Sequence, residues 1–212
     1  LIAYVRGNLF RFATRAGREE LWIGDVGNSE WEEIDRIGDI NDGVAENFGW
    51  PCYEGVGRQP AFDAANLDIC ESLYTAGTAS GPYFTYNHAS KVVAAELCPT
   101  GGSSVAGSVF YPAGGGSYPA AYSGALFFAD YSRNCIWAMK PTSPGGLPSP
   151  NNIETFGSAA SAPTDLAIGP GGELYYTDLG GGTVRRIRYF PANQPPVAVA
   201  TGSPTSGGVP LT

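Results

Sequence analysis

Few side chains of this 212-residue chain are of the types that carry out acid–base or nucleophilic chemistry. His88 is the only histidine, so any serine or cysteine triad would have to use it. We expect His88 to be structural instead, hydrogen-bonded to a neighbouring sheet. Glu32 and Glu33 are adjacent on a predicted strand, where successive side chains point to opposite faces. On their own, these two residues would be interpreted as a solvated acidic pair on a strand.

The four cysteines lack the C-x-x-C spacing of a zinc or redox site. Two disulfides are the better interpretation, because two lysines and abundant Gly, Ser, Thr and Asn fit a secreted protein in an oxidising compartment. Of three possible pairings we favour Cys52 with Cys70, which closes one loop, and Cys98 with Cys135, which joins consecutive repeats. Four free buried thiols are the alternative. We therefore expect an extracellular protein.

A short apolar strand that ends in an aspartate and a small-residue turn occurs three times. The copies are ELWIGDVG at 20–27, ALFFADYS at 125–132 and ELYYTDLG at 173–180. Asp130 and Asp178 are 48 residues apart, and Asp25 and Asp130 are 105 apart, so we expect one degenerate copy in the longer interval. A period near 50 is typical of β-propeller blades. Each aspartate is expected to bond turn amides within its blade.

A second apolar run follows each turn, in WEEIDRI, CIWAM and TVRRI, and another precedes the first and third copies at 10–13 and 166–168. Three strands per blade are therefore predicted, in sheets packed on both faces. No convincing helix is predicted, and residues 61–73 are expected to be an ordered loop with one helical turn. The fold class is all-β, a partial propeller of about three to four blades over residues 1–190.

The ends of the chain and its charge add further expectations. Too few blades are present to close a ring, so further blades of the same protein are expected upstream of Leu1. Residues 191–196 are predicted to be a Pro-rich linker.

The net charge of −8 argues against a nucleic-acid partner and an anionic membrane surface. No apolar run is long enough to span a bilayer.

Two motifs carry a resemblance to a known family: GDVGNSEWEEIDRI at 24–37 and NFGWPCYEG at 47–55. With them the chain resembles the C-terminal half of the glucose/sorbosone dehydrogenase family, six-bladed propellers that include soluble quinoprotein sugar dehydrogenases. NLFRF, YNH and SSVAGSVFYP support the likeness, which covers most of residues 1–190. Residues 197–212 resemble the first strand of a PKD domain, an immunoglobulin-like β-sandwich that would be truncated here.

The resemblance implies calcium and pyrroloquinoline quinone (PQQ) as cofactors and a sugar or polyol as substrate. The carbonyls of Gly27 and Asn28 match ligands of the cofactor-linked calcium, and Glu32 and Glu33 match carboxylates around a second calcium. Asn8 matches a residue that contacts the quinone. The catalytic histidine of the family belongs to the upstream half, so no catalytic residue is expected in this chain.

The chain departs from the family where cations should meet the quinone carboxylates. Arg6 lies one residue out of register, an Arg-x-Arg is replaced by residues 162–164, and a lysine is replaced by Ser132 and Arg133. Arg133 could still meet a carboxylate, although an arginine on a surface hairpin is the plainer interpretation.

Two functions follow from the resemblance. One is a secreted quinoprotein that oxidises a sugar or polyol, and the other is a non-catalytic propeller that binds carbohydrate or protein, as the hedgehog-interacting proteins do. Three tryptophans could stack on sugar rings or simply pack between blades: Trp31, Trp50 and Trp137.

Overall fold

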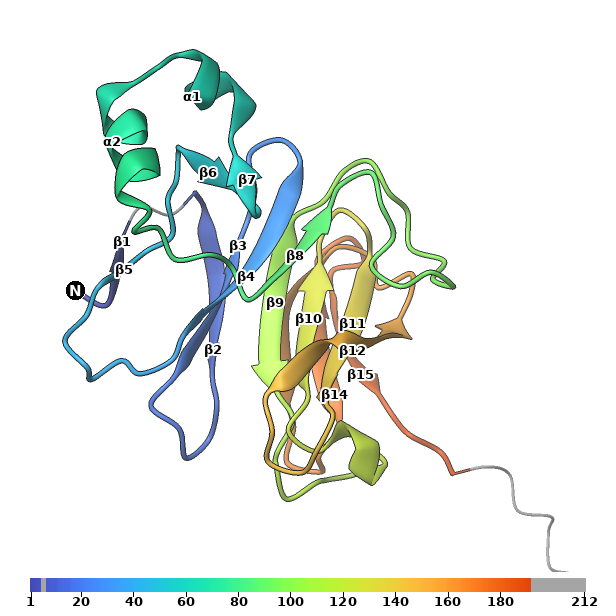
Figure 1. Ribbon diagram of the computed structural model, residues 1–212. Helices are drawn as coiled ribbons and strands as arrows, with labels where there is room; N and C mark the ends of the chain where they lie inside the picture. Colours follow the sequence, from blue (N-terminus) through green and yellow to red (C-terminus); the bar gives the residue numbers. More distant parts are fainter. Residues whose placement is uncertain (5–6, 192–212) are drawn as a thin grey trace, which may run out of the picture.

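Three antiparallel sheets follow one another along the chain in this computed structural model, which describes residues 1–4 and 7–191 (Figure 1). Sheet 1 contains β2 (Leu9–Thr14), β3 (Leu21–Asp25), β4 (Trp31–Ile37) and β8 (Phe84–Asn87) in that order. Sheet 2 contains β9 (Val105–Phe110), β10 (Leu126–Asp130), β11 (Cys135–Pro141) and β12 (Pro148–Gly157). Sheet 3 contains β13 (Pro163–Ile168), β14 (Leu174–Asp178) and β15 (Thr183–Ile187).

The sheets are arranged as blades, with their first strands against one another. Strand β9 contacts both β2 and β13. Glycine permits part of this approach, because a Cβ at Gly107 would lie 3.0 Å from Leu166 Cγ. The chain is therefore a partial propeller, and the predicted all-β class is confirmed.

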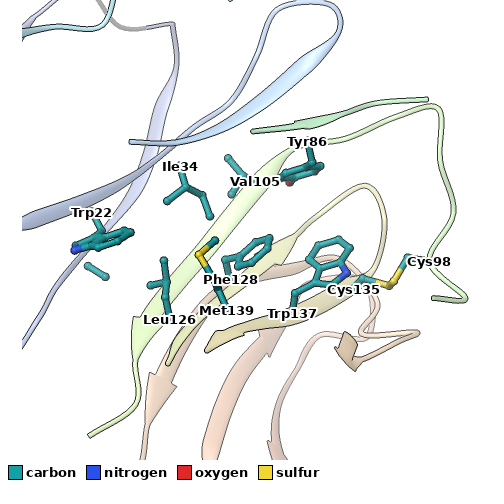
Figure 2. Packing of buried hydrophobic residues seen from close by; sticks show 11 residues of the cluster. Trp22, Ile34, Tyr86, Cys98, Val105, Leu126, Phe128, Cys135, Trp137 and Met139 are labelled. Carbon is teal, nitrogen blue, oxygen red and sulfur yellow. A yellow bond between two sulfur atoms is a disulfide. The ribbon is translucent and has the colours of Figure 1, made fainter. Parts of the chain in front are cut away.

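The central strands β10 and β11 of sheet 2 are buried on both faces, as their dense apolar sequences predict. On β10 the alternate side chains of Leu126 and Phe128 pack with Trp22, Ile34 and other residues of sheet 1 (Figure 2). Phe127 and Ala129 point the other way, into a cluster with residues of sheet 3. A strand buried on both faces has no polar alternation, so its sequence is nearly continuously apolar.

The interval between the first two repeats does not hold a degenerate blade. It contains an insertion between the third and fourth strands of sheet 1, with short strands and two helices. Strand β5 (Glu46–Asn47) pairs in parallel with β1 (Ala3–Tyr4), and β6 (Tyr53–Glu54) pairs with β7 (Gly57–Arg58). The doubled spacing therefore reflects a long connection within one blade.

Two helices correct the expectation of a loop at residues 61–73. Helix α1 (Pro60–Ala64) begins at a proline, and Gln59 accepts hydrogen bonds from the first-turn amides. Helix α2 (Asp68–Ala76) ends at Gly77, which adopts a left-handed conformation with φ 60°. Pro60 is thus a helix-starting proline, whose missing N–H and fixed φ suit the first position. A single 3₁₀ turn, η1 (Ala120–Tyr122), precedes β10.

Both predicted disulfides are present. Cys52–Cys70 ties the β6 region to α2, and Cys98–Cys135 ties the connection between sheets 1 and 2 to β11. The linker predicted at 191–196, apart from Pro191, and the PKD-like strand at 197–212 lie outside the described residues. Over the described part of the chain, no helix is long and apolar enough to cross a membrane.

The three repeated aspartates occupy equivalent positions, each as the last residue of the second strand of its sheet. Asp25 accepts from the backbone N–H of Asn8 at 2.6 Å, and Asp178 accepts from that of Gly181, also at 2.6 Å. Asp130 accepts from the N–H groups of Ser104 and Arg133, at 2.9 and 2.8 Å. The expected bond to a turn amide is thus present for Asp130 and Asp178, whereas Asp25 binds an amide of the segment that precedes β2.

Replacing Asp130 by alanine should lower the free energy of unfolding by about 3 kcal/mol or more. Two backbone N–H groups and the Tyr86 hydroxyl, at 2.7 Å from Asp130, would lose their acceptor in the interior. Urea denaturation followed by tryptophan fluorescence measures the loss. Asp165→Ala is the control, because Asp165 is half-exposed and its ion pair with Arg11 should contribute about 1 kcal/mol or less. Equal losses in the two variants would contradict the assigned role.

Candidate functional site

A pocket of about 340 Å³ lies at the end of the sheets where the first strands begin and the second strands finish. Each sheet contributes one residue at each of these places: Asn8 and Val26, Ser104 and Tyr131, Thr164 and Leu179. The remaining lining residues are Phe10, Val105 and Ala106. Small-molecule sites in proteins have this size and this mixture of apolar walls and a few polar groups.

Buried acidic side chains accept hydrogen bonds from the backbone of the pocket wall. Asp25 accepts from the N–H of Asn8, and Asp130 accepts from that of Ser104. Glu32 Oε2 accepts from the N–H of Val105 at 2.8 Å, which links sheet 1 to the first strand of sheet 2. The N–H groups of Asn8, Ser104 and Val105 at the pocket wall are therefore already engaged by carboxyl groups of the protein itself.

Glu32 and Glu33 point to opposite faces of β4, as strand geometry requires. Glu32 also contacts His88, whose Nε2 lies 2.8 Å from Glu32 Oε1. Burial raises the pKa of Glu32 to about 8, and desolvation lowers the pKa of His88. Near neutral pH the two groups thus share a single proton. The side chain of His88 thus bonds within its own sheet, whereas its carbonyl accepts from Arg133 of sheet 2 at 3.1 Å, so the expected bond to a neighbouring sheet is made by the backbone.

Glu33 belongs to a cluster of buried acids that also contains Asp25 and Asp35. Ligand oxygens of the three carboxylates lie within 4.8 Å of one another. Burial raises the pKa of Glu33 to about 8, and the nearby Asp35 and Asp25 add to the shift. Closely spaced oxygens of this kind are the donors that a hard cation such as calcium prefers.

Sequence reasoning missed Asp35 and gave Asp25 only a turn role, although the pairing of β3 with β4 would have placed both residues near Glu33. Glu33 and Asp35 are two residues apart and share a face of β4, while Asp25 on β3 pairs directly with Glu33. Combining the two-residue period with the hairpin register places all three on one face.

The turn that carries Gly27 and Asn28 is held by Glu54 from the insertion. The Glu54 carboxylate accepts from the N–H groups of Ser29, Glu30 and Trp31 at 2.8, 2.7 and 3.1 Å. Burial opposes ionisation of Glu54, but these donors outweigh it and lower its pKa. Sequence reasoning missed Glu54 because the contact bridges segments far apart in the chain.

Glycine is required at position 27, because a Cβ there would lie 1.6 Å from the carbonyl oxygen of Trp31. A cavity of about 10 Å³ adjoins this turn and is lined by residues that include Gly27, Glu33 and Glu54. That volume is close to the smallest that holds a single water-sized particle.

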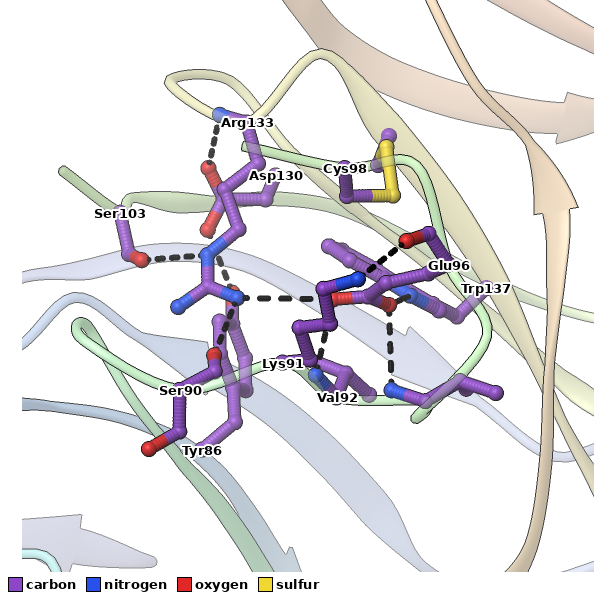
Figure 3. Close-up of a disulfide and its surroundings, with 12 residues drawn as sticks. Tyr86, Ser90, Lys91, Val92, Glu96, Cys98, Ser103, Asp130, Arg133 and Trp137 are labelled. Carbon is purple, nitrogen blue, oxygen red and sulfur yellow. Dashed lines mark hydrogen bonds and ion pairs between the residues drawn. A yellow bond between two sulfur atoms is a disulfide. The ribbon is translucent and has the colours of Figure 1, made fainter. Parts of the chain in front are cut away.

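Arg133 is fully buried, which corrects the interpretation of a surface hairpin arginine (Figure 3). Its guanidinium donates to Ser103 Oγ and to the carbonyls of Ser90, Asn87 and His88 at 2.7 to 3.1 Å. These contacts fasten the connection that follows β8 and favour a structural role. Of the other residues matched to the quinone, Asn8 lines the pocket and Arg6 lies outside the described residues.

The tryptophans pack within the protein. Trp137 is fully buried and donates to Glu96 Oε2 at 2.7 Å, and Trp50 meets Phe62 edge to face. Trp31 covers Gly55, where a Cβ would lie 2.8 Å from its ring. The aromatic residues at the pocket are instead Phe10 and Tyr131, 39% and 42% exposed.

Comparisons with known proteins support the fold. No protein-family model and no curated protein sequence matches the chain. Among solved structures, it is similar to the PQQ-bound form of an aldose sugar dehydrogenase from Streptomyces coelicolor, with a TM-score of 0.54 and 15% identity over 88% of this chain and 44% of that one. A glucose dehydrogenase gives a TM-score of 0.59 and 15% identity, covering 90% of this chain and 47% of that one.

A calcium structure of a Trichoderma reesei carbohydrate-active enzyme of family AA12 gives a TM-score of 0.53 and 11% identity, covering 86% of this chain and 52% of that one. This chain thus spans about half the length of the structures it matches. At these identities the likeness concerns architecture: the chain has the fold of about half of a sugar-dehydrogenase propeller.

Proposed function

We propose that this chain forms half of a secreted sugar or polyol dehydrogenase propeller, with its substrate at the pocket where the first strands begin. The observation that carries the proposal is the pocket itself, to which all three sheets contribute at equivalent positions. The shared fold and the two sequence motifs support it. Further blades of the same protein complete the ring and supply the catalytic histidine. Two disulfides support an extracellular location.

PQQ, the cofactor implied by the resemblance, would accept hydride from the substrate in a dehydrogenase of this type. The described residues of the pocket wall do not fit it, because they include no cation for its carboxylates. We therefore assign no step of the reaction to contacts between this half and the quinone.

Calcium fits better, and we propose that Asp25, Glu33 and Asp35 bind it. Three buried carboxylates so close together repel one another, and a divalent cation would offset that repulsion. Glu32, the other carboxylate expected from the resemblance, faces away and is engaged by His88 and Val105. The carbonyls of Gly27 and Asn28 remain proposed ligands of a calcium on the pocket side. Glu54 would keep their turn in place.

Glu33→Gln should affect stability mainly when calcium is present. In a chelating buffer at neutral pH the melting temperature should change little, because burial and the nearby acids raise the pKa of Glu33 to about 8, so that its side chain is mostly uncharged, as glutamine is. With millimolar calcium the variant should lose most of the stabilisation that calcium gives the wild type. Differential scanning calorimetry measures both effects. Glu30→Gln, the same change at an exposed site, should behave as the wild type. If calcium stabilises Glu33→Gln fully, the cluster is not its site.

A second function, non-catalytic binding of carbohydrate or protein at the same face, is favoured by the absence of cations from the described pocket wall. The two functions are separated by reconstituting the complete protein with PQQ and calcium. A dehydrogenase should show an absorbance change of bound quinone and reduce a dye in the presence of aldoses. Sugar binding without either signal would favour the second function, and no sugar binding would exclude both carbohydrate functions.

Tyr131→Ala should weaken sugar binding by about 3- to 10-fold, since a half-exposed ring on the wall of the pocket would be lost. Isothermal titration calorimetry measures the change. Tyr131→Phe should keep most of the affinity because the ring face remains. Tyr189→Ala removes a comparably exposed ring outside the pocket and should leave binding unchanged. Equal weakening by both alanine variants would argue against this pocket.

A further inference from the structure

We infer that the part of the pocket that this chain forms selects an uncharged, hydroxyl-rich ligand. It disfavours anions, including the tricarboxylate PQQ. The choice of a sugar-like ligand rests on the proposed function. The exclusion of anions rests on contacts alone, and three observations support it: the residue types of the wall, the groups behind the wall, and the arrangement of the nearby cations.

The first observation is the composition of the wall. In a chain of net charge −8, the described residues that line the pocket include no acidic and no basic side chain. The polar lining consists of the amide of Asn8 and the hydroxyls of Ser104, Thr164 and Tyr131. Amides and hydroxyls both donate and accept hydrogen bonds, as the hydroxyl groups of a polyol do. Tyr131 adds a half-exposed ring for the apolar side of such a ligand, and Phe10 adds a second ring, over which the guanidinium of Arg11 lies at 4.8 Å.

The second observation concerns the backbone N–H groups at the strand ends, which in other proteins make anion sites. Here those of Asn8, Ser104 and Val105 donate to Asp25, Asp130 and Glu32 respectively. For each of these three N–H groups, a ligand anion would have to compete with a carboxyl oxygen that is already in place. It would also approach the negative charges of Asp25 and Asp130.

The third observation is that the described cations of this region are engaged elsewhere. Arg133 donates its guanidinium N–H groups to Ser103 and to backbone carbonyls, and lies 3.9 Å from Glu96. Arg11, which extends from β2, lies over the ring of Phe10 at 4.8 Å and pairs with Asp165 of β13 at 3.4 Å, so that the ion pair brings no net charge to the wall. An anion therefore finds no basic side chain among the described lining residues and finds three of the wall's N–H groups already engaged, so desolvating the anion there would be poorly compensated.

The test compares two probes that differ in a single carboxylate, glucose and glucuronate, by ligand-observed NMR titration of the 212-residue chain. We expect glucose to bind the wild type more tightly than glucuronate does. Leu179→Arg places a cation on the wall at a site that is 61% exposed and therefore tolerant. It should raise glucuronate affinity about 2- to 5-fold, a gain that disappears at high salt. Asn8→Lys is a second variant with the same expected direction.

Leu97→Arg is the matched control, because Leu97 is 86% exposed and does not line the pocket. It should leave both affinities unchanged. Tighter binding of glucuronate than of glucose by the wild type, with a steep salt dependence, would overturn the inference. An equal gain of glucuronate affinity in Leu97→Arg would do the same, since the effect would then be non-specific attraction.

Binding of neither sugar would contradict the proposed carbohydrate function, and an absorbance titration with PQQ then decides the charge inference by itself. Weak or undetectable binding to the wild type, with measurable binding to Leu179→Arg, supports the inference. Tight binding of PQQ to the wild type overturns it. Absence of PQQ binding to both proteins shows that this wall forms no ligand pocket, which also overturns it.

Discussion

Buried carboxylates that accept backbone N–H groups organise the end of the propeller that carries the pocket. Asp25, Asp130 and Asp178 each finish a second strand and bind amides of an adjacent turn or of the segment before a first strand. Glu32 extends the same interaction from sheet 1 to sheet 2. Backbone donors compensate much of the cost of burying charge. The starts of β2 and β9 at the pocket are held by these bonds, whereas in sheet 3 the bond from Asp178 holds the turn that follows β14.

The sequence predicts well those features that arise from local chemistry or from repetition. The equivalent placement of Asp25, Asp130 and Asp178 follows from three copies of one strand-and-turn motif, and the doubly buried β10 follows from its unbroken apolar run. The disulfide pairs follow from their spacing relative to the repeats. In each case the information lies within a few residues, or within one repeat period, of the feature that it specifies.

Where a feature depends on segments that are distant in the sequence, its prediction was wrong or was not made. Arg133 is buried because the connection after β8 folds over it, and nothing adjacent to it in the sequence shows this. Glu54 reaches the turn after β3 from an insertion whose extent a repeat count cannot give. The insertion also doubled the apparent repeat interval and suggested a blade that is not there. The acidic cluster is an intermediate case, since register and alternation specify it once the β3–β4 hairpin is assumed.

The insertion between β4 and β8 has a consequence for the order of folding. Strands β2, β3 and β4 are joined by tight turns and can form a meander early, whereas β8 must find the edge of β4 from the far end of residues 38–83. The entropic cost of closing such a long loop rises only slowly with its length, but non-local pairing slows folding. Until β8 arrives, the outer edge of β4 is open to other strands. The first blade therefore keeps an open strand edge for longer during synthesis than a blade whose strands follow one another directly.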